Sequence, residues 1–126
     1  MFKINQDASI FLTRGDIANI VVNVNDSGGE PYRFAKGDIV RFMVFEKNAC
    51  NCVVLCKSVE VTEETTSVEI YLTGSETRIG EAINKPKDYW YEVELNPDTQ
   101  PQTIIGYDED GAKIFRLFPE GVQENG

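Results

Sequence analysis

The sequence predicts an all-β protein, folded as a sandwich or barrel of about eight strands. Three observations favour this fold class. Apolar and polar residues alternate with a period of two, which is typical of strands that bury one face. Turn-forming residues separate these runs at short intervals, as they do in sandwiches and barrels. No long segment has the 3.6-residue period of an amphipathic helix.

The alternation and the turns between the runs define the expected elements. The clearest alternation places apolar residues on one face of 18–24, 68–72 and 89–95. The eight expected strands cover residues 8–12, 17–25, 39–46, 52–61, 67–73, 88–96, 102–107 and 112–118. An acidic turn, Asp108-Glu109-Asp110-Gly111, predicts a hairpin between the last two. One helical turn or two are expected near 75–79, ended by Gly80.

The length of 126 residues predicts a single domain over residues 1–126. The residues from about 120 to 126 are mostly polar, so we expect them to form a frayed tail. The start of the chain lacks the apolar stretch of a signal peptide, and no apolar run is long enough for a membrane helix. The sequence therefore predicts no membrane insertion.

Two expected strands are apolar on both faces, although a sandwich buries only one face of each strand. In 39–45 either the odd-numbered or the even-numbered set is surplus, and in 114–118 either Phe115 and Leu117 or Ile114 and Phe118. Surplus apolar side chains predict self-association or docking of a partner, unless the loops 25–36 and 80–87 cover them. The residues assigned to this interface are Ile39, Met43, Phe45, Trp90, Phe115 and Leu117.

Charge and composition exclude several classes of function. The chain has 12 basic and 21 acidic residues, a net charge of -9, and no histidine. A nucleic-acid-binding protein needs a basic surface for the phosphates, so we expect no nucleic acid as partner. The lack of histidine excludes Ser-His-Asp and Cys-His catalysis. No pair of carboxylates lies in an apolar context suited to acid–base catalysis, so the sequence predicts no enzyme and no cofactor.

Three short motifs are each explained by structure rather than chemistry. Cys50, Cys52 and Cys56 would share a strand face without a CxxC pattern, so we expect three free thiols and no metal site. Free thiols without a signal peptide indicate synthesis in a reducing cytoplasm. The 108–111 turn lacks the later ligands of a calcium loop. Arg14-Gly15-Asp16 spells an adhesion tripeptide but is expected to be a turn between strands.

Trp90 is the single tryptophan of the chain and alternates with Tyr89 and Tyr91. It therefore points to the opposite face from the two tyrosines. An exposed Trp90 could stack on a sugar or anchor a partner protein, whereas a covered Trp90 would be structural. Both possibilities stay open at the level of sequence.

The order of motifs resembles a known family. The motifs are the Leu12-Thr13-Arg14-Gly15-Asp16 turn, the Ile70-Tyr71-Leu72-Thr73 strand followed by Glu76-Thr77, and the Tyr91-x-Val93-x-Leu95 strand. Over residues 8 to 118 the chain resembles the N-terminal domain of the phage baseplate upper protein and related prophage proteins of Gram-positive bacteria. This resemblance implies an antiparallel immunoglobulin-like β-sandwich. It further implies a non-enzymatic structural part of a phage tail, made in the bacterial cytoplasm and carried in the virion tail.

The partners implied are other phage structural proteins or further copies of this chain. We expect no long helical or fibre-forming segment after the domain. A carbohydrate-binding β-sandwich with an exposed aromatic platform is the alternative function.

Overall fold

The computed structural model describes residues 1–46, 52–107 and 111–121, and these residues form a mostly β structure. Nine strands and one short helix are present in the described residues. In chain order the elements are β1 (Phe2–Ile4), β2 (Ile10–Thr13), β3 (Ala18–Val22), β4 (Ile39–Phe45), β5 (Val53–Glu60), β6 (Val68–Leu72), α1 (Gly74–Thr77), β7 (Lys87–Leu95), β8 (Gln102–Ile105) and β9 (Lys113–Phe118). The all-β prediction is confirmed.

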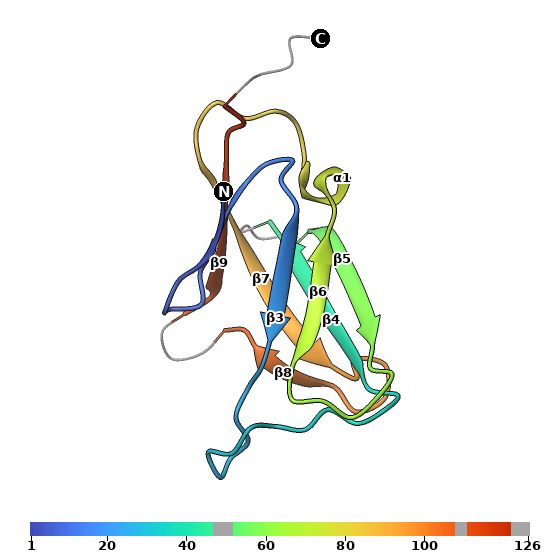
Figure 1. Cartoon of the computed structure of the whole chain (residues 1–126). Coiled ribbons are helices and arrows are strands. Elements are labelled where there is room, and N and C mark those ends of the chain that lie inside the picture. The colour runs from blue at the N-terminus through green and yellow to red at the C-terminus, as the bar shows by residue number, and fades with distance from the viewer. Residues whose placement is uncertain (47–51, 108–110, 122–126) are drawn as a thin grey trace.

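The strands form one large and one small sheet. The large sheet has the order β1-β2-β9-β7-β4-β5, with β8 paired to β7, and the small sheet pairs β3 with β6. Figure 1 shows β3 and β6 crossing in front of β4 and β7. The expectation of a purely antiparallel fold is wrong, because β2 and β9 pair in parallel. These two strands lie near opposite ends of the chain, so the intervening residues provide the long connection that a parallel pair requires.

The hairpin expected between the last two strands is not seen either, because β8 and β9 do not pair with each other among the described residues. β7 is nine residues long, and different parts of it pair with β8 and β9. Residues 87–91 pair with β9, whereas residues 93–95 pair with β8. The local turn pattern could not reveal this arrangement, because it depends on the length of β7. Asp108, Glu109 and Asp110 lie outside the described residues.

The hydrophobic core lies between the two sheets. Both strands of the small sheet show strict alternation of buried and exposed residues, as the sequence predicts. On the large sheet, β7 buries Tyr89, Tyr91, Val93 and Leu95, again as predicted. The even-numbered residues of β4, Val40, Phe42 and Val44, are fully buried. We call this core-facing side of the large sheet the inner face, and the opposite side the outer face.

Two short elements differ from the expectation. β1 has no counterpart in the predicted strands, because its three residues are too few to show a period. The helix α1 is one turn long and begins earlier than expected, with Thr73 as its N-cap. The Thr73 side chain accepts a hydrogen bond from the Glu76 amide, and the Glu76 carboxylate accepts one from the Thr73 amide. This capping box satisfies two amides that the helix itself cannot.

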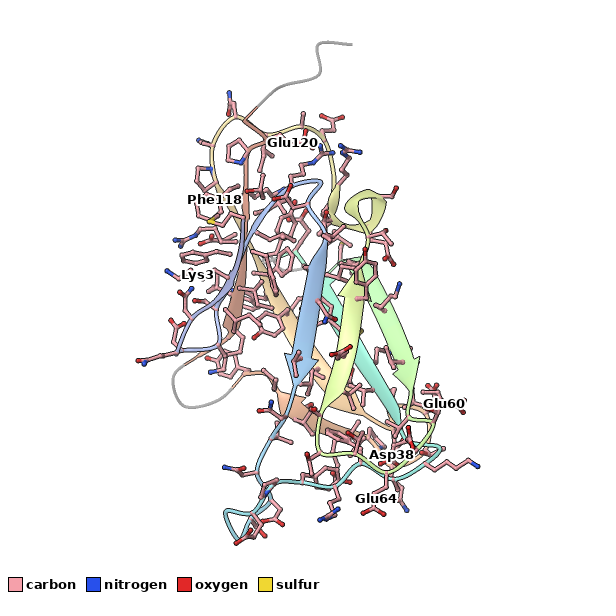
Figure 2. The ribbon with its side chains drawn as sticks, viewed as in Figure 1. Lys3, Asp38, Glu60, Glu64, Phe118 and Glu120 are labelled. Atoms are coloured by element: carbon pink, nitrogen blue, oxygen red, sulfur yellow. The ribbon has the colours of Figure 1, made fainter. Side chains whose placement is uncertain are left out.

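The turn at residues 13–16 connects β2 to β3 and is hydrogen-bonded to the helix α1. Gly15 has φ of +90° there, and its amide donates to Thr77 Oγ1 at 3.1 Å. The Arg14 guanidinium donates to the carbonyl oxygen of Gly80 at 2.7 Å. Glu120 forms an ion pair with Arg78 at 3.2 Å. The prediction that residue 120 belongs to a frayed tail is therefore wrong. Figure 2 shows Glu120 at the opposite end of the molecule from Glu60 and Glu64. Residues 122–126 of the expected tail lie outside the described part.

Candidate functional site: the outer face of the large sheet

The outer face of the large sheet has no second sheet over it among the described residues. Strand register places Trp90 between Phe45 on β4 and Ile114 on β9. The neighbouring row places Arg116 between Asp88 on β7 and Phe11 on β2. The outer-face side chains of these rows are half-buried, in contrast to the fully buried inner face. The outer face is therefore a surface on which apolar side chains from several strands gather.

The structure divides the six predicted interface residues between the two faces. Ile39, Met43, Phe45 and Trp90 lie on the outer face and are half-buried. Phe115 and Leu117 are 0% exposed in the core, so their assignment to an interface is wrong. Their neighbours Ile114 and Phe118 take the outer face instead. Periodicity alone could not distinguish the two sets, because both faces of β9 are apolar.

Phe45 and Trp90 form the centre of the outer face. Their rings pack edge to face, with centroids 6.2 Å apart and an interplanar angle of 89°. Next to them lies a hollow of about 140 Å³. Its wall is formed by Phe45, Trp90, Tyr91, Glu92, Tyr107, Ala112 and Lys113. For comparison, a dry cavity of about 150 Å³ holds one benzene ring, so a single six-membered ring fits this hollow.

Sequence reasoning placed Glu92 beside Trp90 but missed Tyr107 and the hollow itself. Tyr107 follows β8 and is 73% exposed. Glu92 alternates with the buried tyrosines and valine of β7, which placed it on the outer face but gave no sign of a hollow. Burial raises the pKa of Glu92, and the neighbouring charge of Glu94 raises it further. The wall of the hollow therefore combines four aromatic residues with a partly desolvated carboxylate.

A second aromatic pair lies on β2 and β9, at the other side of the outer face. The rings of Phe11 and Phe118 are 5.5 Å apart at an angle of 62°. The Arg116 guanidinium lies 5.1 Å from the Phe11 ring centroid and donates to both carboxylate oxygens of Asp88, at 2.6 and 3.1 Å. Figure 2 shows Phe118 on the side of the molecule away from Glu60, the last residue of β5. The ion pair thus lies between the two aromatic clusters.

The other sequence motifs add no chemical site. Cys52 takes part in a disulfide and Cys56 is an exposed free thiol, so the expectation of three free thiols is wrong. Cys50 lies outside the described residues. Within the described ranges, no group of three His, Cys, Asp or Glu residues could hold a metal ion. Arg14, Gly15 and Asp16 form the expected turn. None of the described helices is long and apolar enough to cross a membrane.

Comparisons with protein-family models, with curated proteins and with solved structures find no match to this chain. The class that the fold and the outer face define is therefore a small all-β domain with a half-buried aromatic surface on one sheet.

Proposed function

We propose that this protein is a non-enzymatic assembly module of a phage or prophage tail, with an immunoglobulin-like sandwich fold. The outer face of the large sheet is its docking surface for another tail protein. Docking is supported by the outer face itself. Met43, Phe45 and Trp90 are half-buried there, and no second sheet of the described residues covers them. Aromatic residues and methionine are enriched where proteins associate. The resemblance to baseplate proteins supports the phage context.

The charge pattern supports a protein partner of a particular kind. Glu92 and Glu94 lie on β7 beside the aromatic cluster and opposite Met43 and Arg41 of β4. The chain as a whole has a net charge of -9. Complementary charge steers association, so we propose a tail protein whose docking surface is basic around an apolar centre.

The test is to induce phage particles from the bacterium that carries the gene and to purify them. The proposal expects peptides of this chain in the particles at a fixed ratio to known tail proteins. A Trp90→Glu variant should be lost from the particles, because a charge replaces an apolar anchor at the centre of the face. A Tyr71→Glu variant, which changes an exposed aromatic residue of the small sheet, should still be incorporated.

Circular dichroism must show that both variants are folded. Absence of the chain from intact particles, or equal incorporation of both variants, would contradict the proposal.

A second candidate function is carbohydrate binding, and the hollow beside Trp90 favours it. Aromatic rings around a space for one six-membered ring suit the apolar face of a pyranose, and the Glu92 carboxylate can accept hydrogen bonds from its hydroxyls. The fluorescence of the single tryptophan reports directly on this hollow. Titration with cell-wall oligosaccharides should change Trp90 emission with saturation in wild type but not in Tyr107→Ala. Unchanged emission with all oligosaccharides would exclude this function.

A further inference from the structure

The edge of the small sheet differs from the other exposed strand edges. β3 pairs along one side with β6, through the register Ala18↔Leu72 to Val22↔Val68. On its other side no described strand pairs with it. In Figure 1 β6 lies beside β5, whereas the far side of β3 has no strand next to it. The backbone groups on that side are therefore available to a further strand.

β3 also lacks the features by which natural proteins protect an exposed edge. Such edges usually carry a lysine, a proline, a bulge or an inward-pointing charge. β3 reads Ala-Asn-Ile-Val-Val, with no charge, no proline and a continuous register. Its solvent side presents Val21, which is 44% exposed, and the preceding Ile17 is 60% exposed.

The two outer edges of the large sheet show the contrast. β5 has an inward-facing lysine, because Lys57 is opposite the buried Phe42. The Lys57 ammonium lies 3.0 Å from the Glu76 carboxylate of α1. The register of β5 with β4 is also interrupted between Val44 and Phe45. The other edge, β1, is only three residues long and carries Lys3. β8 pairs only with β7, and it is four residues long with a register interrupted between Val93 and Glu94. All three edges are thus protected, whereas β3 is not.

We propose that β3 pairs with β3 of a second copy of this chain, antiparallel, to form one continuous four-stranded sheet across a symmetric dimer. The register places Ile20 opposite Ile20 of the second copy and Ala18 opposite Val22. This register keeps the three buried residues of each copy on the core side, since residues of equal parity share a face. Asn19 of each copy then lies opposite Val21 of the other on the solvent side.

A second copy fits this edge better than a different protein. The chain has a net charge of -9, so two copies can approach each other only where the surface carries no charge. β3 brings no charged side chain to the contact. When β3 pairs antiparallel with itself, buried residues lie opposite buried residues and exposed residues opposite exposed ones. This inference is independent of the outer face and of its proposed partner.

The variant that tests the proposal is Val21→Lys. In the single chain residue 21 is directly opposite Glu69 of β6, so a lysine there gains a cross-strand ion pair and the fold is retained. In the dimer the two lysines lie on neighbouring diagonal positions of one sheet, where like charges repel. Sedimentation equilibrium of wild type should give a mass that rises with concentration to twice that of one chain. The Val21→Lys variant should keep the mass of one chain throughout, and its melting temperature should equal that of wild type diluted to the monomer.

Two matched variants separate edge pairing from other contacts. Tyr71→Lys places the same charge on the same small sheet but on β6, away from the free edge, and should still dimerise. Trp90→Lys changes the outer face and should also dimerise. Hydrogen exchange of the β3 amides should slow as concentration rises. A wild type that stays monomeric at every concentration would overturn the proposal, and so would dimerisation that survives Val21→Lys or is lost in Tyr71→Lys.

Discussion

The two faces of β4 carry similar side chains in different surroundings. On the inner face Val40, Phe42 and Val44 are 0% exposed, whereas Met43 and Phe45 on the outer face are half-buried. Both sets are apolar, so composition does not separate them. Their energetic roles differ because only the inner set is surrounded by the second sheet. The inner face therefore determines the stability of the fold, and the outer face is available for binding.

The largest expected effect is a loss of stability on the inner face. Phe42→Ala removes a fully buried ring that packs 5.5 Å from Tyr91 and 6.3 Å from Phe115. It should lower the free energy of unfolding by about 3–5 kcal/mol. Phe45→Ala should cost about 1 kcal/mol, because a half-buried ring loses only part of its transfer free energy. Urea unfolding followed by circular dichroism measures both values, and equal losses would contradict the distinction between the faces.

The sequence predicted the inner face well and the outer face poorly. Strict alternation in β3, β6 and β7 identified their buried residues, because one solvent-exposed face makes the period visible. In β9 both faces are apolar, so Phe115 and Leu117 were assigned to the wrong side. Local sequence patterns also could not predict the order of the strands, because the parallel β2–β9 pair joins residues about a hundred positions apart.

The candidate site shows the same limit of prediction. Trp90 was placed opposite the two tyrosines by its alternation with them, whereas residues 39–45 are apolar on both faces and left open which set, with or without Phe45, faces outward. Tyr107 was missed because it follows β8 without a strand pattern of its own, and the hollow depends on the position of β8 and β9 along β7. Contacts between segments distant in sequence carry no local signal.

The next effect concerns a hydrogen bond of the inner face. The Tyr91 hydroxyl donates to the carbonyl oxygen of Ala8, a residue with φ of 71°. Tyr91→Phe removes the donor and should lower the free energy of unfolding by about 1–2 kcal/mol. Thermal melts at neutral pH measure this loss. An unchanged melting temperature would show that the bond contributes nothing to the fold.

Alkaline pH provides a second measurement of Tyr91. Burial, and then the nearby charge of Asp7, raise the pKa of Tyr91 from 10.0 to about 12. The folded protein thus holds this proton more tightly than the unfolded chain. The resulting stability is complete below the unfolded pKa and is lost as pH rises from 10.0 towards about 12. The stability difference between wild type and Tyr91→Phe should therefore shrink over this interval, and a constant difference would contradict it.

A smaller effect is expected for the ion pair of the outer face. Asp88→Asn removes a carboxylate that binds the Arg116 guanidinium at 2.6 and 3.1 Å. The side chains are 28% and 38% exposed, so solvent screens the pair and its loss should cost about 0.5–1 kcal/mol. High salt should reduce this cost, which urea unfolding at two ionic strengths measures. A larger loss of stability, or a loss that salt does not change, would contradict the conclusion that the outer face is only half-buried.

The smallest effect has the opposite sign and lies beside Trp90. Burial, and then the charge of Glu94, raise the pKa of Glu92, so the folded state disfavours the charged carboxylate relative to the unfolded chain. Stability linked to this group is complete below its unfolded pKa and is lost as pH rises through its folded pKa. At neutral pH, Glu92→Gln should therefore stabilise the fold by a few tenths of a kcal/mol, since a neutral amide avoids that cost. In acid, where Glu92 itself is protonated, the gain should disappear. Glu69→Gln, at an exposed position of β6, is the matched control for removing one negative charge from an acidic chain. A gain at neutral pH that is equal in both variants would mean that general charge repulsion, and not desolvation of the outer face, causes the effect.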